Sequence, residues 1–167
     1  VSRALGWPSV PLTVIRDGPH GVGSVQLYID SNPGITYFDL IDGRPDDLRR
    51  FAVFDLLVNN ADRKASHCLL GGDNQLWSID HGLTFHSVFK LRTVMLEFWG
   101  EAIPEALVDD LVSLLDRLAT TSRLRDDLAE YLDQVDIEAL EKRLQALVDC
   151  PVLPRLDPYR NVPWPWV

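Results

Sequence analysis

The chain has 167 residues, which is enough for one domain and little more. Hydrophobic residues make up 46% and charged residues 25%, both ordinary for a globular protein, so we expect a packed core. The formal net charge of −9 argues against nonspecific binding to nucleic acid or to an anionic membrane, because such surfaces would repel the chain overall.

Further features of the composition narrow the class of protein. No apolar run approaches the roughly 18–20 residues that span a bilayer, so we expect no stable insertion into a membrane. Cys68 and Cys150 form neither a metal-type spacing nor a disulfide framework, which favours a reduced, cytoplasmic setting. The opening residues VSRALGW contain no Met and look like the middle of a helix, so we expect a fragment whose preceding residues are missing.

The first part of the chain predicts a helix end and a β-hairpin. Residues 1–6 resemble the end of a helix that Gly6 and Pro8 stop. The runs 11–17 and 24–30 are rich in β-forming residues, and the turn-forming sequence DGPHGVG lies between them. An antiparallel pair of strands is the simplest interpretation.

The middle of the chain predicts a helix followed by a second, smaller hairpin. In RPDDLRRFAVFDLLVNN, which begins at Arg44, apolar residues recur at helical spacing. The apolar runs 67–70 and 76–79 are separated by GGDN, a sequence that favours a tight connection between two strands.

After about residue 88 the pattern predicts helix, except in the last residues. We expect helices that begin at Pro104, that contain Leu124, Leu128 and Leu132, and that carry the apolar stripe Ile137, Leu140, Leu144 and Leu147. The final DPYRNVPWPWV contains three prolines and cannot form a regular helix, so we expect Trp164 and Trp166 to pack it across the surface. The whole order predicts an α+β fold that is mostly helical.

The polar stretch NNADRKASH concentrates chemically active side chains. It supplies Asp62, Arg63, Lys64 and His67, and Asp80 stands directly after the second strand of the small hairpin. Because paired strands lie about 5 Å apart, the two ends of that hairpin should meet. We therefore expect these carboxylates, cations and imidazole to converge on one small volume.

Such a set suits phosphoryl transfer. Mg²⁺ binds through one or two carboxylates together with phosphate oxygens, and a second carboxylate can orient or deprotonate the attacking hydroxyl. In protein kinases the catalytic loop has an Asp and, five residues later, a metal-binding Asn, and another metal ligand lies in D-F-G. Here the loop is D-R-K-A-S-H and the later motif D-H-G, so His67 replaces the Asn and His81 the Phe.

The stretch FDLLVNNADRKASHCLL, followed by LWSIDHGLTFH, resembles the catalytic loop and metal motif of the phosphatidylinositol 3-/4-kinase-like superfamily. Within it, the type II phosphatidylinositol 4-kinases are most similar, and the match is specific over residues 55–86. The resemblance implies a protein-kinase-like C-lobe over 31–167, with 1–30 as a remnant of the N-lobe and hinge. Identical positions are Asp55, Asn60, Asp62, Arg63, Leu69, Ile79, Asp80, Gly82, Leu83 and Phe85.

The resemblance also implies roles for residues around a bound nucleotide. Asp62 would be the catalytic Asp, Lys64 would approach the γ-phosphate, and Arg63 would belong to the same catalytic group. Asp80 would be the principal metal ligand and His67 the second, with ATP and Mg²⁺ or Mn²⁺ as cofactors. The residues that would contact the nucleotide are Gln26, Leu27 and Tyr28 in the hinge strand, Leu69 under the adenine, and Ile79.

Several alternatives stay open. The alternative for Arg63 is a structural role, in which its side chain pairs with Asp55 on the preceding helix. Neutral imidazole suits Mn²⁺ better than Mg²⁺, so His67 favours a manganese preference. The glycine-rich loop, strand Lys and helix Glu of a kinase N-lobe have no counterpart before residue 11.

The sequence therefore leaves three functions in competition. We expect first an ATP-dependent phosphotransferase whose acceptor is a protein hydroxyl or a small polar metabolite. The second is a pseudokinase-like module that binds nucleotide, metal or a partner without turnover. The third is a metal-dependent phosphohydrolase that uses His67, His81, His86, Asp62 and Asp80.

Overall fold

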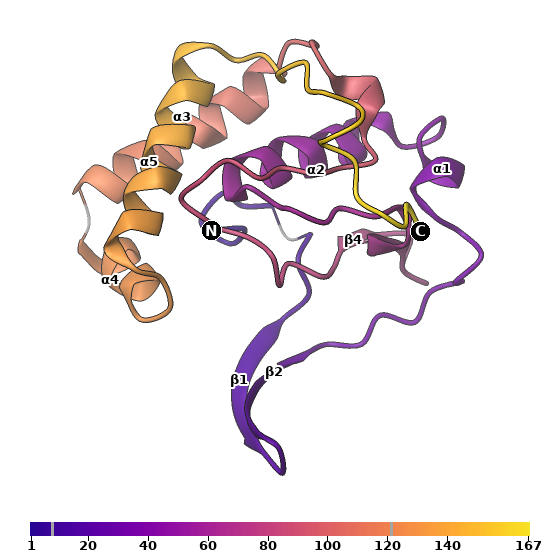
Figure 1. The fold of residues 1–167 in the computed structure, drawn as a ribbon, viewed down its shortest axis with the longest axis horizontal. Helices are drawn as coiled ribbons and strands as arrows, with labels where there is room; N and C mark the ends of the chain where they lie inside the picture. Colours follow the sequence, from indigo (N-terminus) through magenta and orange to yellow (C-terminus); the bar gives the residue numbers. More distant parts are fainter. Residues whose placement is uncertain (8, 121) are drawn as a thin grey trace.

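A computed structural model describes residues 1–7, 9–120 and 122–167, and confirms the α+β class. It contains two small antiparallel hairpins and a set of helices (Figure 1). The elements in chain order are β1 (Thr13–Gly18), β2 (Gly21–Gln26), α1 (Tyr37–Leu40), α2 (Pro45–Val58), the 3₁₀ helix η1 (Ala65–His67), β3 (Cys68–Leu70), β4 (Leu76–Ser78), the 3₁₀ helix η2 (Leu96–Phe98), α3 (Glu105–Thr120), α4 (Ser122–Ala129) and α5 (Gln134–Asp149).

Helix α2 is the central element of the body. Its residues from Phe51 to Val58 are all buried, so other segments surround the second half of the helix on every side. Helices α3 and α5 lie beside each other at one end of the body (Figure 1). Helix α5 presents Ile137, Leu140, Leu144 and Leu147 to the core, as its apolar spacing predicts.

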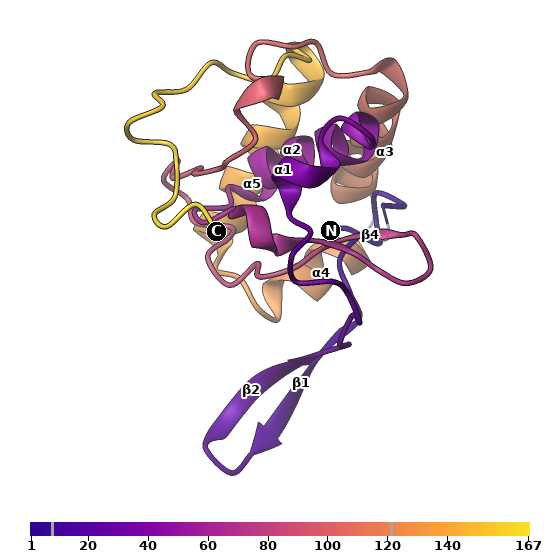
Figure 2. The same ribbon diagram turned by 90° about the vertical axis from the view of Figure 1, so that its right-hand side faces the viewer.

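The first hairpin stands away from the helical body (Figures 1 and 2). Its second strand was expected over 24–30, but β2 runs from Gly21 to Gln26, and the turn consists of Pro19 and His20 alone. Gly21, at φ +102°, lets the chain reverse within this short turn, so the flanking glycines belong to the strands.

The first residues pack on the body and do not form a helix. Residues 2–6 make hydrogen-bonded turns, and Gly6 has a left-handed φ of +71°. Leu5 and Trp7 belong to the main core, whereas Pro8, expected to stop a helix, lies outside the described residues. The division of the chain at residue 30 stays a prediction.

The second hairpin forms where the sequence predicted it. Cys68 pairs with Ser78 and Leu70 with Leu76, across a turn that contains the GGDN sequence. Beyond the strands, the Ile79 N–H donates to the His67 carbonyl at 3.0 Å. The two ends of the hairpin therefore meet, as expected.

The expectation of helix after residue 88 is wrong for residues 88–104. Apart from η2, this segment is irregular, because its backbone groups bond to distant parts of the chain. The Thr93 N–H, for example, donates to the Asn161 carbonyl at 2.8 Å. The three later helices are confirmed, although Leu132 lies beyond the end of α4.

The last residues are irregular, as predicted, but only one of the two tryptophans contacts the body closely. The Trp164 side chain is 85% exposed, so the expectation that it docks is wrong. Trp166 lies against Val94 and Val162 in a small pocket. Among the described residues, no helix combines the length and the apolarity needed to cross a membrane.

Truncation of the fully buried Leu144 to Ala should lower the free energy of unfolding by about 2–5 kcal/mol, because it leaves a cavity between α5 and the core. Val135→Ala on the exposed side of the same helix is the matched control and should change it by less than about 0.5 kcal/mol. Urea unfolding followed by circular dichroism measures both. Equal losses would show that α5 does not pack as described.

Candidate active site

Two adjacent asparagines end α2 and fix the segments that follow. Asn59 closes the helix in a left-handed conformation, φ +55°, which Asn tolerates well. Its side-chain amide donates to the carbonyls of His86 and Val88, and its Oδ1 accepts from the Lys90 N–H. Asn60 donates to Asp55 and accepts from the Asp62 N–H, so it holds the start of the loop 60–67 against α2.

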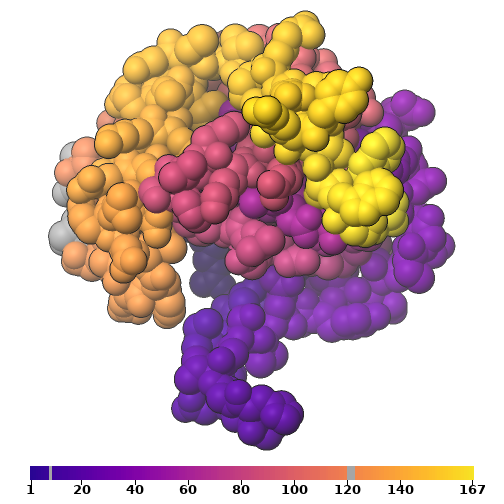
Figure 3. Space-filling model, in the orientation of Figure 1, coloured from indigo at the N-terminus to yellow at the C-terminus, as the bar shows by residue number. Residues whose placement is uncertain are grey.

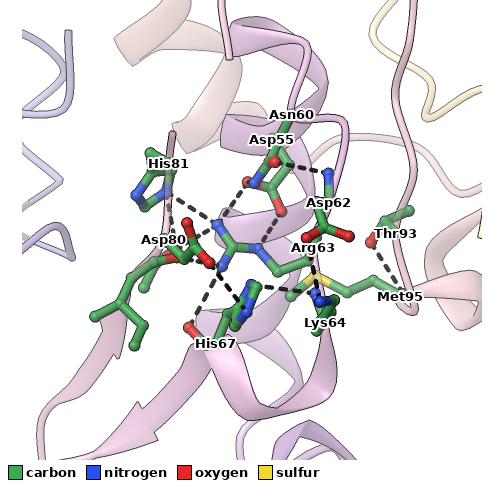
Figure 4. Close-up of polar contacts among 12 residues, drawn as sticks. Asp55, Asn60, Asp62, Arg63, Lys64, His67, Asp80, His81, Thr93 and Met95 are labelled. Atoms are coloured by element: carbon green, nitrogen blue, oxygen red, sulfur yellow. Dashed lines mark hydrogen bonds and ion pairs between the residues drawn. The ribbon is translucent and has the colours of Figure 1, made fainter. Parts of the chain in front are cut away.

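The Arg63 guanidinium lies at the centre of the site (Figure 4). Its Nε and Nη2 donate to the two oxygens of Asp55 at 2.6 and 2.9 Å, a bidentate pair. The remaining N–H groups reach the Ile79 carbonyl at 2.8 Å and the Ser78 hydroxyl at 2.8 Å, and the His67 carbonyl lies at 3.4 Å. One side chain thus joins α2, the loop 60–67 and the end of the second hairpin.

This ion pair is completely enclosed. Arg63 and Asp55 expose 0% and 1% of their side chains, which makes the pairing between them structural. Burial alone would lower the pKa of Arg63, but the charge and hydrogen bonds of Asp55 outweigh it and raise the pKa above its ordinary value. The alternative in which Arg63 pairs with Asp55 is therefore what the molecule contains, and the guanidinium is shielded from solvent.

His81 packs against the same guanidinium as a neutral ring. Its Nε2 lies 2.9 Å from Arg63 Nη2 and 3.1 Å from the Ser78 hydroxyl, and its ring meets Phe54 edge to face. Burial and the Arg63 charge lower the pKa of His81 to about 4. Arg63 Nη2 already donates its two hydrogens to Asp55 and Ser78, so the Ser78 hydroxyl is the donor to His81 Nε2. The proton of the ring then sits on Nδ1, which is buried and has no hydrogen-bond partner among the described residues.

Contacts outside the buried ion pair connect four further residues, which are Asp62, Lys64, His67 and Asp80. Lys64 Nζ lies 3.3 Å from Asp62 Oδ2, and the Lys64 N–H points to His67 Nδ1 at 3.4 Å. His67 Nε2 in turn lies 3.4 Å from Asp80 Oδ2. The expected convergence of Asp62, Lys64, His67 and Asp80 is visible in Figure 4.

Electrostatics ties these groups together. Burial and the Arg63 charge lower the pKa of His67, while Asp80 and Asp62 act in the opposite direction, so both carboxylates are near the ring. Asp80 has a left-handed φ of +55° and a side chain that is 59% exposed. Asp adopts this conformation more readily than most residues, and here it places the carboxylate beside His67.

The residues predicted to contact a nucleotide fall into two groups. Leu69 lies on β3 and Ile79 follows β4, so both belong to the hairpin that carries the site. Gln26 ends β2 and bonds to Thr13, whereas Leu27 and Tyr28 are exposed. The segment after β2 returns to the site only at Ser31, which pairs with Gly71 in the turn of the second hairpin.

The other histidine of the region has a structural role. His86 is exposed, and its Nδ1 accepts from the Val88 N–H at 2.9 Å in a local turn. Within residues 1–7, 9–120 and 122–167, no group of three or more His, Cys, Asp or Glu side chains could hold a metal ion.

Some residues that build the site were not predicted. Ser78 faces Arg63 from β4, and Thr93 pairs with it through the backbone in a parallel bridge. A polar residue inside the short apolar run LWSI was the available signal for Ser78. Nothing local marks Thr93, because its partner is far away in the sequence.

Comparison with known proteins places the chain in a family. No family model matches it. Protein Rv2133c of Mycobacterium tuberculosis is 38% identical over a 200-residue alignment that covers 99% of this chain and 71% of the mycobacterial protein. The chain belongs to the Rv2133c family.

The chain also has a weaker similarity to a kinase. Phosphatidylinositol 4-kinase gamma 4 of Oryza sativa subsp. japonica is 28% identical over 107 residues. The match covers 58% of this chain but only 19% of the rice protein. The chain is thus partly and weakly similar to a phosphatidylinositol 4-kinase, over less than a fifth of that protein.

Loss of Asp55 should be among the most damaging single changes in the molecule. Asp55→Ala leaves the Arg63 charge buried without its partner and should lower the free energy of unfolding by about 3–5 kcal/mol. The double variant Asp55→Ala/Arg63→Met should lose less than the two single losses added together. Urea unfolding of the four proteins gives the coupling energy.

The matched control for this double-mutant cycle is an exposed ion pair on α2. Asp46 lies 2.7 Å from Arg49 with a side chain that is 93% exposed, and Asp46→Ala should cost less than about 1 kcal/mol. Strict additivity of the Asp55 and Arg63 losses would contradict the described clamp.

His81 should make the protein less stable as the pH falls. Between about pH 6.5 and pH 4, the unfolded chain binds a proton on this ring that the folded protein excludes, so the free energy of unfolding decreases with falling pH. The contribution should reach about 3 kcal/mol at the acid end. His81→Gln should remove that part of the slope when unfolding is measured at several pH values in metal-free buffer, and an unchanged slope would refute the assignment.

Proposed function

We propose that this chain carries the catalytic loop and metal motif of an ATP- and metal-dependent phosphotransferase of the kinase-like type. The observation that carries the proposal is the continuous chain of contacts from Asp62 through Lys64 and His67 to Asp80. Two carboxylates from separate segments, one loop cation and one imidazole thus lie next to the buried pair of Arg63 and Asp55. The weak, partial similarity to a phosphatidylinositol 4-kinase supports the same class.

Asp62 is the proposed acceptor of the proton from the attacking hydroxyl. Its carboxylate is 27% exposed, which leaves it accessible to an acceptor molecule, and the bond from its N–H to Asn60 fixes the backbone. Lys64 balances its charge in the resting protein and can turn to the transferred phosphoryl group. Arg63 is a positioning residue in this scheme, because its buried guanidinium sets the loop and the hairpin end relative to each other.

The residues present fit a divalent cation held partly by phosphate oxygens. Mg²⁺ commonly takes one or two carboxylates and completes its shell with phosphate and water, which requires no group of three protein ligands. Asp80 supplies the exposed carboxylate. When bound, the metal would neutralise charge on the phosphate groups.

The hydrogen bonds of His67 favour one of its two proposed roles. Because its Nδ1 accepts from the Lys64 N–H, its Nε2 carries the proton and points to Asp80. In this tautomer the ring orients Asp80, and a metal at Nε2 would require the proton to move and the Lys64 contact to break. His67 as a second ligand, and with it a manganese preference, is therefore the weaker version of the proposal.

A phosphohydrolase with all its metal ligands from the protein is less well supported. Such a site needs three or more ligands around one ion, and the described part of the chain offers no such group. His81 and His86, which that function would use, are engaged in contacts with Arg63, Ser78 and Val88.

Thermal unfolding with nucleotide and metal tests the proposal. ATP with Mg²⁺ should raise Tm, because a ligand that binds only the folded state stabilises it by RT ln(1 + [L]/Kd). Asp80→Asn should abolish the metal-dependent part of the shift, while Asp73→Asn, an exposed carboxylate in the hairpin turn, should leave it unchanged. The absence of any shift with ATP, ADP or GTP and either metal, for this chain and for the whole product of its gene, would contradict the proposal.

Turnover distinguishes an enzyme from a binding module. Asp62→Asn should keep the nucleotide-dependent rise in Tm but lower the rate of phosphate transfer, or of slow transfer to water, by at least about 100-fold. Nucleotide binding with an equally low rate in the unsubstituted protein would identify a pseudokinase-like module. A faster rate with Mn²⁺ than with Mg²⁺ would restore His67 as a metal ligand.

A further inference from the structure

A small pocket lies beside the catalytic loop, on the side formed by the last residues of the chain. It measures about 90 Å³ and is lined by Phe38, Val94, Leu96, Glu97, Val162 and Trp166. One water needs about 10–15 Å³ of such space, so this pocket holds several water-sized groups. It therefore suits the end of one side chain and is too small for a nucleotide.

The backbone connects this pocket directly to the loop that carries Asp62. The Ala65 N–H donates to the Trp166 carbonyl at 2.8 Å, and the Val94 N–H donates to the Arg63 carbonyl at 3.1 Å. Asn161 holds the same segment in place through its side-chain donation to the Leu91 carbonyl at 2.7 Å. Figure 3 shows the 154–167 segment, in yellow, lying across this face of the molecule.

The lining combines aromatic rings with one carboxylate. Phe38 and Trp166 are both partly exposed, so the faces of their rings are accessible from solvent. Glu97 accepts a hydrogen bond from the Tyr37 hydroxyl at 2.5 Å through Oε2, and this contact together with burial raises the pKa of Tyr37. The bond fixes the carboxylate at the pocket and leaves Oε1 for another partner.

A mostly apolar lining of aromatic and aliphatic side chains with one carboxylate suits a group that has an apolar stem and a cationic head. A Lys or Arg head near an aromatic face gains about 0.5–2 kcal/mol, and a carboxylate adds a direct partner. The net charge of −9 attracts cationic molecules to the whole protein and repels anionic ones.

We propose that this pocket binds a basic side chain of a peptide phosphoacceptor, whose hydroxyl is thereby directed to the catalytic loop. This inference rests on the proposed function, because it names the substrate class for the same site. The pocket supplies recognition, and Glu97 and Trp166 are specificity-determining residues that take no part in the chemistry.

Binding of a peptide pair without nucleotide tests the pocket by itself. The probes are an acetylated, amidated Gly-Arg-Gly-Ser-Gly peptide and the same peptide with citrulline, a neutral isostere, in place of Arg. The indole N–H signal of Trp166, identified by its loss in Trp166→Leu, should shift with the Arg peptide in ¹H–¹⁵N spectra. The citrulline peptide should bind at least about fivefold more weakly.

Variants separate the pocket from general attraction to an acidic surface. Glu97→Gln can keep the bond to Tyr37 but removes the charge, and should reduce the preference for Arg over citrulline to less than about twofold. Trp164→Leu is the matched control, because that side chain is 85% exposed and does not line the pocket. Unchanged Tm values for the variants exclude loss of folding as the cause.

The outcomes distinguish this inference from the proposed function. Equal shifts with the two peptides, or a preference that Trp164→Leu removes and Glu97→Gln does not, would overturn the pocket assignment. Arg-selective binding in a protein that shows no nucleotide-dependent Tm shift would support the cation pocket and refute the phosphotransferase. If transfer to the Ser of the peptide is measured with ATP and metal, the Arg peptide should show a kcat/KM about fivefold or more above the citrulline peptide.

Discussion

The buried pair of Arg63 and Asp55 is the interaction on which the site depends. A charge inside a protein must be compensated, so the guanidinium dictates where its acceptors lie, and these come from α2 and from the end of the second hairpin. Removing the charges altogether could preserve stability, but it would also remove the directional bonds that set the loop against the hairpin. We therefore interpret the pair as a device that determines geometry at some energetic cost.

The arrangement of Asp62, Lys64, His67 and Asp80 follows from this buried ion pair. Because the loop and the hairpin end cannot move independently, the carboxylates of Asp62 and Asp80 keep a defined relation without touching each other. Lys64 and His67 fill the space between them in the resting protein. Lys64 lies 3.3 Å from Asp62, and the buried His67 ring lies 3.4 Å from the exposed Asp80 carboxylate. Both distances are longer than those of strong charge-assisted hydrogen bonds, so a ligand can replace these contacts.

The sequence predicts the hairpin and the meeting of its two ends because the determinants of both are local. The turn sequence GGDN sets the hairpin, the hairpin joins His67 to Ile79, and the loop spacing supplies the charged residues. The irregular path of residues 88–104 could not be predicted, since it depends on bonds to Asn59 and Asn161, far away in the chain. Exposure of Trp164 was also out of reach, because residue type predicts burial only on average. The roles of Gln26, Leu27 and Tyr28 come from the resemblance alone.

The projecting hairpin has a consequence for dynamics. Each of its strands has one partner among the described residues, and most of its side chains are exposed. A lone two-stranded ribbon is marginally stable, so β1 and β2 should open by themselves, long before the α2 core does. Its outer edges also carry free backbone groups that any additional strand, from whatever source, could extend into a wider sheet. The same ribbon should therefore exchange its amide hydrogens faster than the α2 core, and it offers an edge on which another strand could assemble.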